Sequence, residues 1–269
     1  MFRLLLKHDW KSIRGILGLL CLICLGAGVL GGFALRFLII AFDQPEFSAY
    51  QMVLAMGSVM ACYAAIIICA AGTLFFCIWR FYKSRYADEG YMTFTLPATA
   101  HQILLSSMTA TLLAMVCAFV AVFVSIFTAV LIGISAVEGA YTEMAQQSPM
   151  VWDAFWEAVS YEKSMFLTLA VYVPVAGIAE VVIMMLSATV GSVVARKLKF
   201  LAAIGIYYGI QVAVSLITSV LMVLTGVTAT SSTTLLDHFF LYPTILMAAL
   251  GIGAYFLMHR LASRKLNLP

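Results

Sequence analysis

A single carboxylic acid, Glu180, interrupts a long apolar stretch between positions 165 and 195, and Pro174 and Gly177 precede it there. An ionisable group inside a membrane helix is costly and usually faces a partner or a water-filled cavity. Proline frees a backbone carbonyl and bends a helix, and glycine permits close approach. These three residues form a candidate pathway site for a substrate, an ion or a gate. The alternative is a structural glutamic acid, protonated or hydrogen-bonded within the bundle.

Cysteine and histidine offer a second kind of chemistry. Cys21 and Cys24 have the Cys-x-x-Cys spacing of some metal and redox sites. All six cysteines lie within apolar runs, which favours small apolar filler: Cys21, Cys24, Cys62, Cys69, Cys77 and Cys117. The four histidines lie at the ends or flanks of such runs and show no metal-ligand spacing: His8, His101, His238 and His259.

The sequence contains no metalloprotease His-Glu-x-x-His, no Gly-x-Ser-x-Gly and no phosphate-binding loop ending in Gly-Lys-Ser/Thr. We therefore expect no catalytic residue, no metal and no cofactor bound by this chain, and no nucleic-acid partner. The chain is not expected to be an enzyme.

Composition indicates the elements that must carry these residues. Of 269 residues, 64% are hydrophobic and only 10% are charged, far from the roughly one quarter charged of soluble domains. A membrane helix needs roughly 20 apolar residues. We predict an all-α integral membrane bundle, a single transmembrane domain over 1–269, with six spans at about 14–41, 50–79, 101–135, 165–195, 200–227 and 241–260. The first apolar run is too long for a cleaved signal peptide, so we expect it to be retained.

The distribution of charge predicts the orientation of these spans. Basic residues gather before the first span, after the second, between the fourth and fifth, and after the sixth: Arg3, Lys7, Lys11, Arg14, Arg80, Lys83, Arg85, Arg196, Lys197, Lys199, Arg260, Arg264 and Lys265. The opposite loops are acidic and include Asp43, Glu143, Asp153 and Asp237, with Arg36 and Lys163 as the basic exceptions. The positive-inside rule then places both termini in the cytoplasm.

Two segments outside the spans have amphipathic patterns. Residues 1–14 alternate apolar and basic side chains, which predicts either a helix lying flat on the inner leaflet or an extension of the first span. In the outer loop 136–164, Ser148 and Pro149 are suitable N-cap and first-turn residues. Trp152, Phe155 and Trp156 follow at helical spacing. We predict a short external helix that acts as an interfacial anchor or as a lid.

Pairs of small residues four apart predict close helix contacts. Gly28 and Gly32 form such a pair in the first span, and Gly205 and Gly209 form one in the fifth. These pairs could form a dimer interface or pack within one subunit.

The inner loop after the second span combines charge, aromatic residues and a helix stop. Asp88 and Glu89 suit the start of a short helix, Tyr91 and Phe94 follow, and Pro97 ends it. A short cytoplasmic helix offering aromatic side chains fits docking into a partner's groove. The alternative is a turn with an interfacial aromatic belt.

The stretch Tyr86-Ala-Asp-Glu-Gly-Tyr-Met-Thr-Phe-Thr-Leu-Pro resembles the signature of bacterial ABC-2-type ABC transporter permeases. The likeness continues into His101-Gln-Ile-Leu-Leu-Ser and, more weakly, Ser187-Ala-Thr-Val-Gly-Ser and Tyr207-Tyr208. Ser107 departs from the lysine that such permeases often have.

The resemblance implies a permease subunit of the bacterial cell membrane, paired with a second permease, identical or homologous, and with cytoplasmic ABC ATPase subunits that bind ATP and Mg. Asp88, Glu89, Gly90, Tyr91 and Phe94 would form the coupling helix that contacts the ATPase. The expected cargo is a hydrophobic or amphipathic substrate such as a peptide antibiotic, a drug or a lipid.

Two other functions remain open. One is an ATP-independent secondary transporter or channel, for which Glu180 would be central, although the sequence shows no convincing repeat of two halves. The other is a membrane anchor for a sensor or an enzyme.

Overall fold

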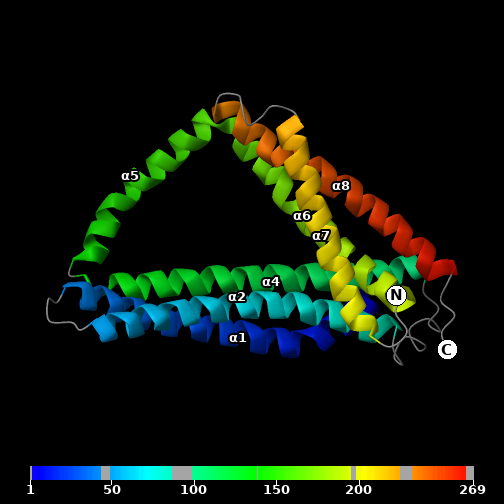
Figure 1. Cartoon of the computed structure of the whole chain (residues 1–269), viewed down its shortest axis with the longest axis horizontal. Helices are drawn as coiled ribbons and strands as arrows, with labels where there is room; N and C mark the ends of the chain where they lie inside the picture. The colour runs from blue at the N-terminus through cyan, green and yellow to red at the C-terminus, as the bar shows by residue number, and fades with distance from the viewer. Residues whose placement is uncertain are drawn as a thin grey trace. The chain divides into compact units, whose positions relative to one another are not determined.

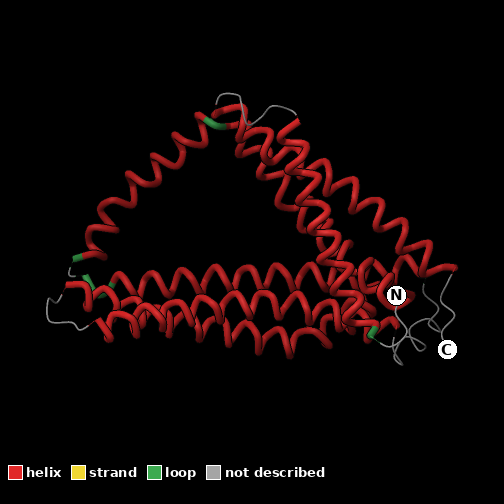
Figure 2. Tube along the Cα trace, viewed as in Figure 1, coloured by secondary structure: helices red, strands yellow, loops and turns green. Residues whose placement is uncertain are grey.

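The computed structural model describes residues 2–43, 49–86, 99–137, 139–194, 198–224 and 232–264, and within these ranges it is built of helices joined by short turns (Figures 1 and 2). The helices are α1 (Phe2–Asp43), α2 (Ala49–Tyr86), α4 (Ala100–Ile134), α5 (Ala140–Tyr161), α6 (Lys163–Val194), α7 (Lys199–Leu224) and α8 (Ser232–Arg264).

Six of these helices are long and apolar enough to cross a membrane: Phe2–Phe42, Tyr50–Arg85, His101–Ile134, Lys163–Val194, Lys199–Leu224 and Phe240–Leu261. Large apolar side chains such as Leu22, Phe119 and Val223 are exposed on their surfaces. Lipid accepts such surfaces because it is as apolar as they are, whereas a water-soluble monomer rarely exposes large apolar patches. The predicted all-α membrane bundle is confirmed.

The chain divides into two compact units, of which one comprises residues 11–74 and 113–155. Within it, long segments of α1, α2 and α4 run side by side (Figure 1). Cys24 and Ala27 of α1 pack with Ile66 and Cys69 of α2 in a buried cluster.

Small residues set the approach of α1 to α4 in this unit. A Cβ added at Gly28 would lie 2.5 Å from the carbonyl oxygen of Ser125, and one added at Gly32 would lie 3.1 Å from the Ala129 carbonyl oxygen. The Ser125 hydroxyl also donates to the carbonyl of Cys24 at 2.7 Å. This glycine pair therefore packs within the chain, which is one of the two predicted alternatives.

The other unit comprises residues 1–10, 75–112 and 156–269, and in it α6, α7 and α8 pack together. A Cβ on Gly191 of α6 would lie 2.6 Å from the backbone nitrogen of Ala203 in α7. Gly205 and Gly209 face open space, with nothing within 4 Å of an added Cβ. The second predicted glycine pair therefore makes no close packing contact among the described residues.

The N-terminal segment is continuous with the first span. A single helix, α1, runs from Phe2 to Asp43, so the structure has the extension rather than a separate flat helix. The predicted short coupling helix falls on residues 87–98, outside the described part of the chain.

The external helix is longer than predicted. Its start at Ala140 follows Gly139, which has φ +79°, so Ser148 and Pro149 lie inside α5 and not at its N-terminus. Proline removes the N–H that would bond the carbonyl four residues earlier. The Ser148 hydroxyl donates to that carbonyl, of Ala145, at 2.8 Å, which explains how the helix tolerates the proline. No residue of α5 is buried.

Candidate functional site

Glu180 of α6 is half-buried and is held by two side chains of α7. The Tyr207 hydroxyl donates to Oε1, and the Gln211 amide lies 2.8 Å from Oε1 and 2.7 Å from Oε2. Tyr207 and Gln211 are one helical turn apart, so they present their donors on one face of α7. The carboxyl group thus bridges α6 to α7 through neutral donors.

This geometry agrees with the hydrogen-bonded glutamic acid that the sequence left as the structural alternative. It leaves the pathway interpretation open, because Glu180 keeps part of its surface accessible. Pro174 is exposed on α6, and a Cβ on Gly177 would meet nothing within 4 Å, so neither takes part in the recorded bonds of Glu180. The three predicted pathway residues lie on one helix, α6, and their role in a pathway stays a prediction.

A second polar cluster, Asp9–Arg85–Ser106–Ser107, joins three helices. Nη2 of Arg85, in the last turn of α2, lies 3.0 Å from Oδ2 of Asp9 in α1 and 2.5 Å from the hydroxyl of Ser107 in α4. The Ser106 and Ser107 hydroxyls lie 3.0 Å and 3.2 Å from the same Asp9 oxygen. The side chains of Arg85 and Asp9 are 3% and 11% exposed.

Breaking a buried ion pair by removing one partner strands a charge, so such a pair fixes the elements that carry it. Here the ion pair joins the beginning of α1 to the end of α2, and the hydroxyls of Ser106 and Ser107 add the beginning of α4. The charge distribution predicts that these three helix ends lie on one side of the membrane. The contact therefore agrees with three spans that alternate in direction.

Sequence reasoning missed the roles of this cluster. Asp9 carries the only carboxylate among the first 42 residues, in a segment rich in Lys and Arg, and that exception was the available signal. From the sequence, Arg85 indicated only the orientation of the spans. Ser107 was notable only because ABC-2-type permeases often have a lysine at this point of the motif. Gln211 was also missed, although an amide in an apolar run, one turn after Tyr207, is unusual.

The predicted coupling residues Asp88, Glu89, Gly90, Tyr91 and Phe94 lie outside the described residues. The structure shows instead how the helices on either side of them, α2 and α4, are connected. Arg85 precedes this segment, and Ser106 and Ser107 follow it. The buried cluster therefore joins α2, which comes before the segment, to α4, which comes after it.

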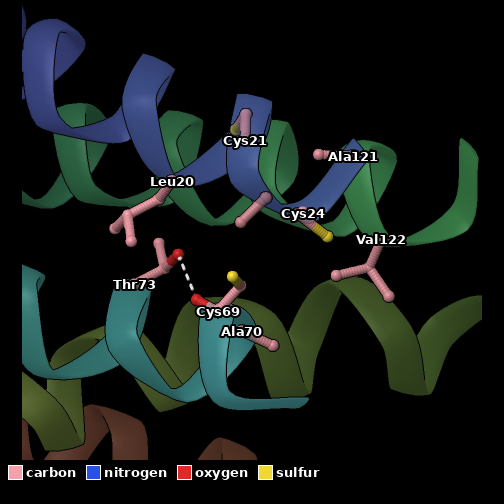
Figure 3. Close-up of a pocket in the computed structure, with 9 residues that line it drawn as sticks. Leu20, Cys21, Cys24, Cys69, Ala70, Thr73, Ala121 and Val122 are labelled. Carbon is pink, nitrogen blue, oxygen red and sulfur yellow. Dashed lines mark hydrogen bonds between the residues drawn. The ribbon is translucent and has the colours of Figure 1, made fainter. Parts of the chain in front are cut away.

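The Cys-x-x-Cys pair packs as ordinary apolar side chains. Cys21 and Cys24 of α1 and Cys69 of α2 border a small cavity of about 10 Å³, shown in Figure 3. The one hydroxyl there, of Thr73, donates to the carbonyl of Cys69 in its own helix at 3.0 Å. Space for about one water sphere between apolar walls fits the predicted filler role. Across the described ranges, no three His, Cys, Asp or Glu side chains gather as they would around a metal ion.

Comparison with known proteins gives no relative: the chain matches no protein-family model, no curated protein and no solved structure. The structure by itself shows a multi-pass bundle of membrane helices, and its described residues include a buried ionic cluster around Arg85 and a half-buried carboxyl site at Glu180.

Proposed function

We propose that this chain is the membrane-spanning permease subunit of an ATP-binding cassette transporter. It would export a hydrophobic or amphipathic substrate, using ATP hydrolysed by a separate subunit. The observation that carries the proposal is the Tyr86–Pro97 motif, which begins at the last residue of α2 and precedes α4. The Asp9–Arg85–Ser106–Ser107 cluster joins these two helices.

The 87–98 segment can transmit force to the membrane spans only through the helices on either side of it, α2 and α4. If an ATPase moves the 87–98 segment, the movement reaches the spans only where α2 and α4 respond together. Arg85 at the end of α2 donates to the Ser107 hydroxyl at the beginning of α4, and both helices are joined to Asp9 of α1, by the ion pair from Arg85 and by the hydroxyls of Ser106 and Ser107. Such a linkage lets two ATPase states bias two arrangements of the spans.

The remaining parts follow from the resemblance. Asp88, Glu89, Gly90, Tyr91 and Phe94 would contact the ATPase, which supplies the ATP and Mg site. A second permease, identical or homologous, would complete the pathway. The protein would lie in a bacterial plasma membrane with both termini in the cytoplasm, as the basic loops predict.

The test is co-expression of this chain with the ATPase encoded beside it, and purification through a tag on the permease. We expect co-elution and vanadate-sensitive ATP hydrolysis. Tyr91→Ala and Asp88→Lys should abolish stimulation of hydrolysis, whereas Tyr161→Ala, on the exposed end of α5, should not. A chain that purifies without an ATPase, or variants at Tyr91 and Asp88 that leave hydrolysis and transport unchanged, would overturn the proposal.

The second candidate function is an ATP-independent secondary transporter or channel. Glu180 favours it, because an accessible carboxyl group held by neutral donors inside a span can exchange protons or bind a cation. Transport driven by a proton gradient and lost in Glu180→Gln would support this candidate over the permease.

A further inference from the structure

An apolar groove lies between α6 and α8, with Met108 of α4 at its edge. Its volume is about 410 Å³, within the range of ligand sites in proteins. Buried Val182 and Met247 form its floor, and exposed Ile178, Ile252 and Phe256 form its rim. The Tyr255 hydroxyl is the one polar side-chain group of the lining.

Two small residues of the lining bring the helices of this groove into contact. A Cβ added at Gly251 of α8 would lie 3.1 Å from the Cβ of Ala179 in α6, so the two helices approach closely at a point where neither carries a large side chain. The neighbouring residues Ile178 and Ile252, which carry larger side chains, also line the groove. The recess therefore has apolar walls.

The groove has the length of one half of a bilayer. Its lining on α8 runs from Met247 to Phe256, which at 1.5 Å per residue is about 14 Å. The hydrocarbon core of a membrane is about 30 Å thick, so one leaflet contributes about 15 Å. An extended acyl chain of a single leaflet therefore matches this recess in length and polarity.

One end of the groove is polar and basic. The Tyr255 hydroxyl is hydrogen-bonded to Nδ1 of His101, whose ring lies 6.3 Å from that of His259. Arg260 is exposed on α8, one helical turn beyond Phe256. The charge distribution of the whole sequence predicts this end of α8 to be cytoplasmic.

We propose that the groove binds one acyl chain of an anionic phospholipid from the cytoplasmic leaflet. The acyl chain of the lipid lies along Val182 and Met247, and the lipid phosphate lies at Tyr255, His259 and Arg260. Apolar walls select the hydrocarbon, and the basic end selects a negative headgroup, since a cation near the membrane surface attracts anionic lipid. The inference uses the predicted orientation and does not depend on ATP-driven transport.

Native mass spectrometry of the purified full-length protein in detergent, titrated with phosphatidylglycerol or phosphatidylcholine, tests the site. Ala248→Trp places an indole in the groove, and the neighbouring Ala249→Trp places it outside, because Ala248 lines the groove and Ala249 does not. We expect Ala248→Trp to weaken phosphatidylglycerol binding roughly tenfold and Ala249→Trp to leave it unchanged. Arg260→Gln should lower the preference for phosphatidylglycerol over phosphatidylcholine roughly fivefold.

Equal binding by both tryptophan variants and the unaltered protein would show lipid that is merely annular and would overturn the site. Failure of the unaltered protein to retain any lipid, or formation of a dimer that Ala248→Trp disrupts, would overturn it too, the latter by showing that a second copy occupies the groove. If Ala248→Trp does not fold, the unaltered protein decides the question. A phosphatidylglycerol with a photoactivatable acyl chain should then crosslink chiefly to the peptides containing Ile178 and Ile252, and adducts spread evenly over all spans would contradict the proposal.

Discussion

Two polar clusters among the described residues surround a carboxyl group differently, both in its burial and in the charge of its partners. Asp9 is almost fully buried and faces the guanidinium of Arg85, with Ser106 and Ser107 sharing the same oxygen. Glu180 is half-buried, and its recorded bonds come from the neutral Tyr207 and Gln211. A charge matched by an opposite charge and closed from solvent is suited to holding helices in place. A carboxyl group that is partly accessible and bonded to neutral donors is held less firmly and can exchange its hydrogen-bond partners.

The comparison predicts first that Arg85 is the most costly side chain to remove. Arg85→Met should destabilise the protein by about 3–5 kcal/mol, because Asp9 is left buried without its cation. Arg14→Met, an exposed arginine on α1, is the matched control and should change stability little. Unfolding in detergent, followed by circular dichroism, measures both.

The double variant Asp9→Leu/Arg85→Met sharpens this prediction. Replacing both members of a buried ion pair by apolar residues is often neutral, so the double variant should recover much of the loss. A double variant as unstable as Arg85→Met alone would contradict the interpretation of the cluster as an ion pair and would indicate that packing at Arg85 dominates.

The next largest effect is expected at Ser107, which accepts from Arg85 and donates to Asp9. Ser107→Ala should cost about 1.5–3 kcal/mol, the range for hydrogen bonds to charged groups. Ser160→Ala, which removes an exposed hydroxyl on α5, should cost less and serves as its control in the same unfolding measurement. Equal losses at the two serines would mean that Ser107 is not part of a charged network.

At the Glu180 site the expected effect on stability is smaller. Tyr207→Phe removes one of two donors to a half-buried carboxyl, and about 0.5–1.5 kcal/mol is expected because Gln211 still bonds both oxygens. Tyr208→Phe, on the adjacent exposed residue, should be near neutral. If Tyr207→Phe lost as much stability as Arg85→Met, the two clusters would contribute equally to stability and the comparison would fail.

Glu180→Gln should change stability least, by less than about 1 kcal/mol, because glutamine keeps an oxygen that accepts from Tyr207. If Glu180 lines the pathway, substrate-stimulated ATP hydrolysis of the assembled complex should nevertheless change several-fold, while co-elution with the ATPase is kept. Unchanged hydrolysis with intact assembly would show that Glu180 is structural only.

The sequence by itself determined the class of this protein and the location of its spans. Each of the six predicted spans corresponds to a helix, although the bounds differ. As described, α4 and α6 end one residue and α7 three residues before the predicted ends, α1 and α2 continue beyond their spans at the basic end, and α8 begins at Ser232, before the predicted start at 241. This part was predictable because lipid requires each backbone group to be satisfied locally, so an apolar run of sufficient length becomes a helix wherever it packs.

Only the tertiary structure decided which polar groups meet. Asp9 and Arg85 are 76 residues apart, and Glu180 and Gln211 are 31 apart. No helical periodicity connects such positions, because their contact depends on how separate helices rotate and cross. The same limit applies to the groove between α6 and α8, which depends on Gly251 meeting Ala179 across two helices. Helix formation is local and can be read from composition, whereas helix pairing is set by the side chains of both partners at once.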